Sequence, residues 1–73
     1  MPLIQVSVPA GSLSADQKTQ LVARITDVMV DVQGIPAVRQ GTWVHVNEVP
    51  DGGWGRAGEV TTLADFQARF GAR

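Results

Sequence analysis

The stretch of residues 14–36 restricts the fold of this chain most, because its pattern is typical of a single long helix with a defined start and end. Ser14 stands three residues before Gln17, which is the spacing of a capping box at a helix N-terminus. Gly34 suits the left-handed conformation that ends many helices, and Pro36 prevents the helix from continuing. The sequence therefore predicts one helix over residues 14–33.

The apolar residues of this stretch recur at intervals of three and four and so share one face of the predicted helix. They are Leu21, Val22, Ile25, Val28, Met29 and Val32. The charged residues of the stretch lie off this stripe. Such a stripe is typical of a helix that packs one side into a core.

Two segments with the pattern of β-strands flank the predicted helix. Residues 4–8 alternate between apolar and polar, which is the period of a strand with one buried face. Residues 42–49 are rich in β-branched and aromatic side chains, with Val44 and Val46 on the face opposite Trp43. A strand, a long helix and a strand predict a β-α-β unit with parallel strands and a right-handed crossover.

The rest of the chain predicts shorter features. Residues 35–41 read as a loop and residues 50–53 as a turn, while residues 54–58 are too rich in glycine for a regular element. Residues 62–70 fit a short helix whose start Thr62 would cap. We therefore expect a short C-terminal tail after the second strand.

The small size of the chain predicts association with further copies. Its 73 residues allow one domain, expected over residues 1–73, of the α+β class with a single β-α-β unit. Two strands and one helix cannot cover both faces of a sheet or satisfy both of its edges. With no cysteine and one histidine, neither disulfides nor a thiolate or imidazole metal cluster would add stability. Oligomerisation is the remaining common solution.

Charge and hydropathy exclude several classes of partner. The net charge is −1, and the six basic and seven acidic residues are scattered, so nucleic acid is not expected to bind. No apolar run approaches the roughly 20 residues that span a bilayer, and the N-terminus lacks the blocks of a signal peptide. The chain is therefore expected to be cytoplasmic and to have no membrane partner.

Three segments together resemble a known family. PLIQVSVPAG at the start, LSADQKTQLVARITDVM in the helix and WVHVNEVPDGGWGRAGE near the end are similar to small tautomerases of the 4-oxalocrotonate tautomerase type. The resemblance implies the β-α-β fold and a homo-oligomer, a hexamer first, with a trimer or dimer as alternatives. It also implies catalysis without a cofactor or metal, in which an amino-terminal proline serves as base or acid.

The resemblance also implies particular site residues. The catalytic proline falls on Pro2, which becomes the first residue once Met1 is removed, and the aromatic wall of the active site falls on Trp54. The arginine that follows the first strand in the family falls near Ser12 and is absent. The arginine that opens the second strand falls on Trp43.

Two other arginines are candidates for binding a substrate carboxylate. Arg39 lies a few residues before the second strand, and Arg56 lies within the glycine-rich segment at a position that is usually apolar in the family. A guanidinium binds a carboxylate in bidentate fashion and stabilises enolate charge. Each arginine could instead be a solvated loop residue or part of an intersubunit ion pair, and Trp54 could instead cap a core or a subunit contact.

The predicted function is that of an isomerase, a tautomerase that converts a small 2-keto or enol acid. Such a reaction needs a group that takes and returns a proton near neutral pH. Desolvation and a nearby guanidinium would disfavour the ammonium form of the Pro2 amine. The alternatives are a hydratase or dehalogenase acting on haloacrylates, and a self-assembling module without catalysis.

Overall fold

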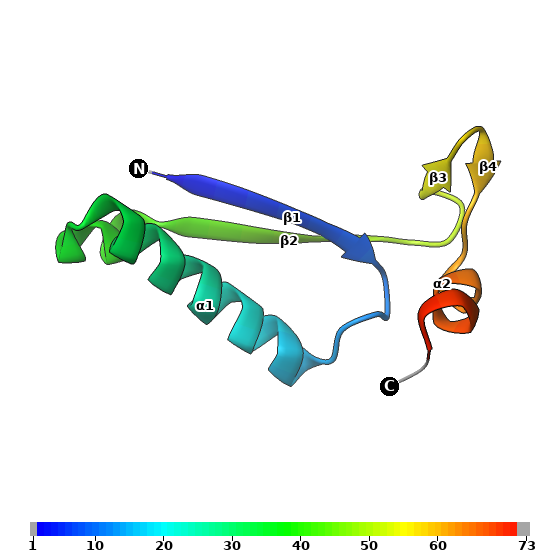
Figure 1. Cartoon of the computed structure of the whole chain (residues 1–73), viewed down its shortest axis with the longest axis horizontal. Coiled ribbons are helices and arrows are strands. Elements are labelled where there is room, and N and C mark those ends of the chain that lie inside the picture. Colours follow the sequence, from blue (N-terminus) through cyan, green and yellow to red (C-terminus); the bar gives the residue numbers. More distant parts are fainter. Residues whose placement is uncertain (1, 72–73) are drawn as a thin grey trace.

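The computed structural model describes residues 2–71 and forms a β-α-β unit followed by a small C-terminal arm (Figure 1). The elements in order are β1 (Leu3–Pro9), α1 (Ala15–Gln33), the 3-10 helix η1 (Pro36–Gly41), β2 (Trp43–Val49), β3 (Gly55–Arg56), β4 (Glu59–Val60) and α2 (Leu63–Phe70). The predicted α+β class and β-α-β unit are confirmed.

The two long strands pair in parallel along their whole length. The register runs from Leu3 opposite Trp43 to Pro9 opposite Val49. The pairing extends beyond both strands, since the Trp43 N–H donates to the Pro2 carbonyl at 2.9 Å and the Ala10 N–H donates to the Val49 carbonyl at 2.8 Å. Both strands therefore begin at the same end of the sheet, where Figure 1 marks the N-terminus.

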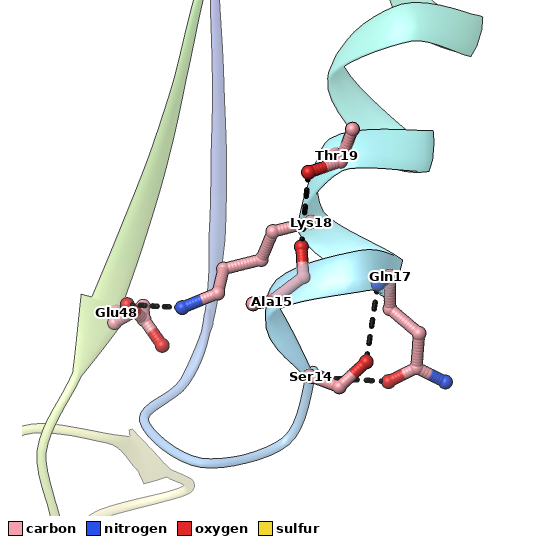
Figure 2. Close-up of polar contacts among 6 residues, drawn as sticks. All are labelled: Ser14, Ala15, Gln17, Lys18, Thr19 and Glu48. Carbon is pink, nitrogen blue, oxygen red and sulfur yellow. Dashed lines mark hydrogen bonds and ion pairs between the residues drawn. The ribbon is translucent and has the colours of Figure 1, made fainter.

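Helix α1 begins and ends where the capping residues predict. The Gln17 N–H donates to the Ser14 Oγ at 3.1 Å, and the Ser14 N–H donates to the Gln17 Oε1 at 2.8 Å (Figure 2). The helix stops at Gly34, which has a φ of 72°. At the N-terminal end of the helix, beside the Ser14 cap, the Lys18 Nζ forms an ion pair with Glu48 of β2 at 3.1 Å (Figure 2).

The face that α1 turns toward the sheet differs from the predicted apolar stripe. Thr26 is the buried residue of the described chain, at 8% exposure, and its hydroxyl donates to the Val22 carbonyl at 2.8 Å. Val28 and Val32 are exposed, the latter at 77%. The prediction was wrong for these valines because a two-stranded sheet, with strands about 5 Å apart, is narrower than the apolar face of the helix.

The other side of the sheet is uncovered. No apolar side chain of residues 2–71 is fully buried, and by strand alternation the uncovered side presents Leu3, Gln5, Ser7, Trp43, His45 and Asn47. The radius of gyration is 15.0 Å, whereas a compact domain of this length would have about 11 Å. A single chain thus lacks the core that a stable domain needs.

Two segments after α1 are more regular than expected. Residues 35–41, predicted as a loop, contain η1. Residues 54–58, predicted as irregular, start a small hairpin in which β3 pairs antiparallel with β4. Its turn consists of Ala57 and Gly58, with φ of 55° and 83°. Positive φ at both central residues matches the twist of a two-residue hairpin, which the glycine content alone did not reveal.

Helix α2 confirms the predicted cap at Thr62. The Asp65 N–H donates to the Thr62 Oγ1 at 3.2 Å, and the Thr62 N–H donates to an Asp65 carboxylate oxygen at 2.9 Å. The Leu63 N–H donates to the Asp51 carboxylate at 2.8 Å, which ties α2 to the turn after β2. Neither helix of the described chain is long and apolar enough to cross a membrane.

Candidate active site

Pro2 lies at the tip of the sheet, immediately before β1. Its side chain is half-buried, and its carbonyl is held by the Trp43 N–H. Met1, whose removal would free the prolyl nitrogen, lies outside the described residues. The backbone at this position is thus fixed on its carboxyl side.

Arg39 lies at the same end of the sheet as Pro2. It belongs to η1, which leads directly into β2, and its carbonyl accepts from the Thr42 N–H at 3.3 Å. Its guanidinium forms an ion pair with Asp27 of α1, and the two side chains are 52% and 62% exposed. An exposed pair of this kind contributes at most about 1 kcal/mol. Arg39 is therefore engaged within its own chain, though only weakly.

Trp54 and Arg56 lie beyond the opposite end of the sheet. The half-buried Trp54 contacts Phe66 of α2 edge to face, with ring centroids 5.8 Å apart. The exposed Arg56 is part of β3. Both residues line an open cleft of about 780 Å³ between the hairpin and α2. Trp54 therefore forms part of an aromatic wall that has a cation beside it.

The structure brings the four predicted site residues together only in pairs. Pro2 and Arg39 occupy one end of the sheet, and Trp54 and Arg56 occupy the other (Figure 1). Strand β1 has seven residues, which span roughly 20 Å at about 3.3 Å per residue. Within one chain, Pro2 and Trp54 therefore do not share a pocket.

The cleft also contains a basic residue that the sequence analysis missed. Arg69 lines it together with Phe66 and Phe70. Arg69 and Phe70 follow Phe66 by three and four residues, which places each of them next to Phe66 on the helix surface. The helical spacing of α2 could have identified Arg69 once Thr62 was accepted as its cap.

The acidic residues of the cleft differ in their roles. Hydrogen bonds from the Thr62 backbone and side chain lower the pKa of Asp65 below its usual value of 3.8. That carboxylate is therefore ionised at neutral pH and serves the helix cap rather than proton transfer. Glu59 also lines the cleft and stands opposite Arg56 in the β3–β4 pairing.

The position near Ser12 offers no replacement for the arginine that the family resemblance leads one to expect there. Ser12 lines a second cleft, of about 460 Å³, between the segment after β1 and α2, and the residues found to line it carry no charge. Within residues 2–71, no three His, Cys, Asp or Glu side chains come close enough to hold a metal ion. A cation that could bind a substrate carboxylate therefore has to lie elsewhere than beside Ser12.

Known proteins are similar to almost all of the chain. Residues 2–64 match the model of a family described as Tautomerase, tautomerase enzyme. A probable tautomerase K2 from Dickeya dadantii (strain 3937) is 36% identical over 69 residues, which cover 93% of this chain and 98% of that protein. A 2-hydroxymuconate tautomerase from Comamonas testosteroni is 33% identical over 58 residues, which cover 80% of this chain and 87% of that protein.

Proposed function

The chain belongs to the tautomerase family, and from this membership we propose that it interconverts the enol and keto forms of a small 2-keto acid without a cofactor. Its function is of the tautomerase type, and the family makes it an isomerase. The observation that carries the finer proposal is the family match that begins at Pro2, together with the place of Pro2 at the tip of β1.

The proposed reaction moves one proton and needs no electron carrier. After removal of Met1, the Pro2 nitrogen is a secondary amine. It accepts the proton of the enol hydroxyl and returns a proton to the carbon at the other end of the double bond, which leaves the ketone and the free amine. Positioned proton transfer of this kind contributes typically 10²- to 10⁴-fold in rate.

We propose that the site forms between chains. Pro2 and Trp54 are separated along the sheet, one sheet face is uncovered, and no apolar side chain of residues 2–71 is fully buried. A neighbouring chain that brings its cleft to Pro2 would complete the site and cover apolar surface at the same time. The tautomerase family supports a small-molecule substrate and an oligomer; a hexamer is our first proposal, with a trimer or dimer as alternatives.

The cleft supports Arg56 over Arg39 as the group that binds the substrate carboxylate. Arg56 lines the same cleft as Trp54, so one neighbouring chain could supply both the cation and the wall. The guanidinium of Arg39 is paired with Asp27. A guanidinium in a partly desolvated cleft would hold the carboxylate and stabilise the enolate that forms during proton transfer.

A hydratase or dehalogenase is the second candidate function, and the place of Glu59 favours it. Its carboxylate lines the cleft beside Trp54 and Arg56. It could there activate a water molecule while a protonated Pro2 donates to the substrate. Halide release from 3-chloroacrylate would identify this reaction, whereas a tautomerase without hydratase activity releases none.

The test uses full-length protein whose loss of Met1 is verified by intact mass. We expect ultraviolet assays to show ketonisation of phenylenolpyruvate, 2-hydroxymuconate or both. Acetylation of the amino terminus should reduce the rate at least 100-fold, because an amide nitrogen is not a base. Protein treated in the same way but without the acetyl donor is the control. Unchanged activity after complete acetylation would exclude Pro2 as the base.

A further inference from the structure

Trp43 is placed directly beside Pro2 by the strand pairing. It is the first residue of β2, stands opposite Leu3, and its N–H donates to the Pro2 carbonyl at 2.9 Å. Neighbouring strands lie about 5 Å apart. The backbone of Trp43 is therefore next to that of Pro2, and a molecule bound at the Pro2 nitrogen reaches the indole by extending over the tip of the sheet.

The indole of Trp43 is not used to pack its own chain. It is 58% exposed and lies on the sheet face opposite α1. The aromatic pairs found among residues 2–71 join Trp54, Phe66 and Phe70 at the other end of the molecule. The ring of Trp43 is thus open to a ligand or to a neighbouring chain.

Arg39 lies at the same end of the sheet as Pro2 and is paired, weakly, with Asp27. The side chains next to Pro2 in the strand pairing are Leu3 and Trp43, which are apolar. A carboxylate placed against these side chains would lose its hydration with little compensation. An aromatic or branched apolar group would instead bury apolar surface against the indole.

We propose that Trp43 is a specificity residue, which selects enol acids with an aromatic or bulky apolar substituent over dicarboxylic acids. This inference rests on the proposed function. The single carboxylate of such a substrate binds a guanidinium supplied by the cleft of a neighbouring chain. The enol group faces Pro2, and the apolar substituent lies on Trp43.

The test compares two enol substrates in four proteins. Phenylenolpyruvate carries one carboxylate and a phenyl ring, and 2-hydroxymuconate carries two carboxylates. The wild type should have the higher kcat/KM for phenylenolpyruvate. Trp43→Ala should lower that value about tenfold, mainly through KM, since an aromatic contact contributes about that factor. Its kcat/KM for 2-hydroxymuconate should stay within about twofold.

Two further variants separate substrate contact from subunit packing. Trp43→Phe keeps an aromatic ring and should keep the preference for phenylenolpyruvate, whereas Trp43→Leu keeps apolar bulk and should lose most of it. Sedimentation verifies that each variant retains the wild-type assembly. Equal substrate ratios in all assembled variants would overturn the role of Trp43.

Binding of unreactive acids distinguishes this inference from the proposed function. Calorimetry should show that trans-cinnamate binds the wild type more tightly than trans,trans-muconate does, and that Trp43→Leu loses this difference. If the wild type turns over neither enol substrate but shows that Trp43-dependent preference, the tautomerase proposal fails and the specificity inference stands. If it turns over substrate without any such dependence, the specificity inference fails alone.

Discussion

The two ends of the sheet differ in what they offer a substrate. The end with Pro2 has a backbone fixed by strand pairing and an apolar surface at Leu3 and Trp43. The end with Trp54 has a cleft lined by aromatic rings and by the guanidinium of Arg56. The Pro2 amine and the cleft that contains Arg56 therefore lie at opposite ends of the sheet, so each end supplies what the other lacks.

The largest expected effect concerns whether the two ends meet across chains. Pro2→Ala, which replaces the ring-held secondary amine by a freely rotating primary amine, and Arg56→Ala should each lose most activity, since each impairs one half of the proposed site. When the two variants are unfolded together and refolded as mixed oligomers, some sites should contain both intact halves, and activity should rise well above either parent.

Each variant refolded alone is the control for this mixing experiment. Ultraviolet assays of phenylenolpyruvate ketonisation provide the measurement. If the mixed sample shows only the average of the two parents despite verified subunit exchange, Pro2 and Arg56 do not serve one site from different chains.

The next largest expected effect distinguishes Arg56 from Arg39 as the group that binds the substrate carboxylate. Arg56→Ala should lower kcat/KM roughly 10- to 100-fold, because a hydrogen bond to a charged group contributes about 1.5–3 kcal/mol. Arg39→Ala should change it less than about threefold, since that guanidinium pairs with Asp27 at the surface. Steady-state kinetics on one enol acid decides between them, and the reverse order would assign the carboxylate to Arg39.

A smaller expected effect tests whether helix α2 can unfold while the β-α-β unit stays folded. Thr62→Ala removes the cap of α2 and should destabilise that helix by about 1 kcal/mol. Because Phe66 of α2 packs on Trp54, tryptophan fluorescence should change before the global urea transition. Ser14→Ala is the matched control, since α1 packs on the sheet and its loss should shift the global transition. If the fluorescence change and the global urea transition of Thr62→Ala coincide, α2 does not unfold independently of the rest of the chain.

The smallest expected effect is a dependence of the stability of helix α2 on pH. The pKa of Asp65 is lowered in the folded chain by its hydrogen bonds with Thr62. Its stabilising contribution is therefore complete above the ordinary aspartate range and is lost as pH falls through the lowered pKa. Tryptophan fluorescence of the wild type should report a local change in acid, and Asp65→Asn should lack that pH-dependent part. An identical acid profile in both proteins would contradict this role.

The β-α-β unit was predictable because its signals are local. Ser14, Gln17 and Gly34 set the bounds of α1, and the alternation in residues 4–8 identified the first strand. Parallel pairing followed from a general rule of chain topology. These features require no knowledge of distant contacts.

Other features depend on contacts between distant residues, which the periodicity of the sequence cannot predict. Which valines of α1 stay exposed depends on the width of the sheet, so Val28 and Val32 were misplaced. The pairing of Arg39 with Asp27 joins residues twelve apart on different elements. The separation of Pro2 from Trp54 becomes evident only when both are placed on the same sheet.

The bond between the Trp43 N–H and the Pro2 carbonyl has an entropic consequence. A lysine amine would have to give up roughly 2 kcal/mol of rotamer freedom to be held in one orientation. The nitrogen proposed as the base belongs to a closed ring, whose neighbouring peptide is already fixed by that bond. Most of the ordering that proton transfer requires would therefore be complete when the sheet folds, before any substrate arrives.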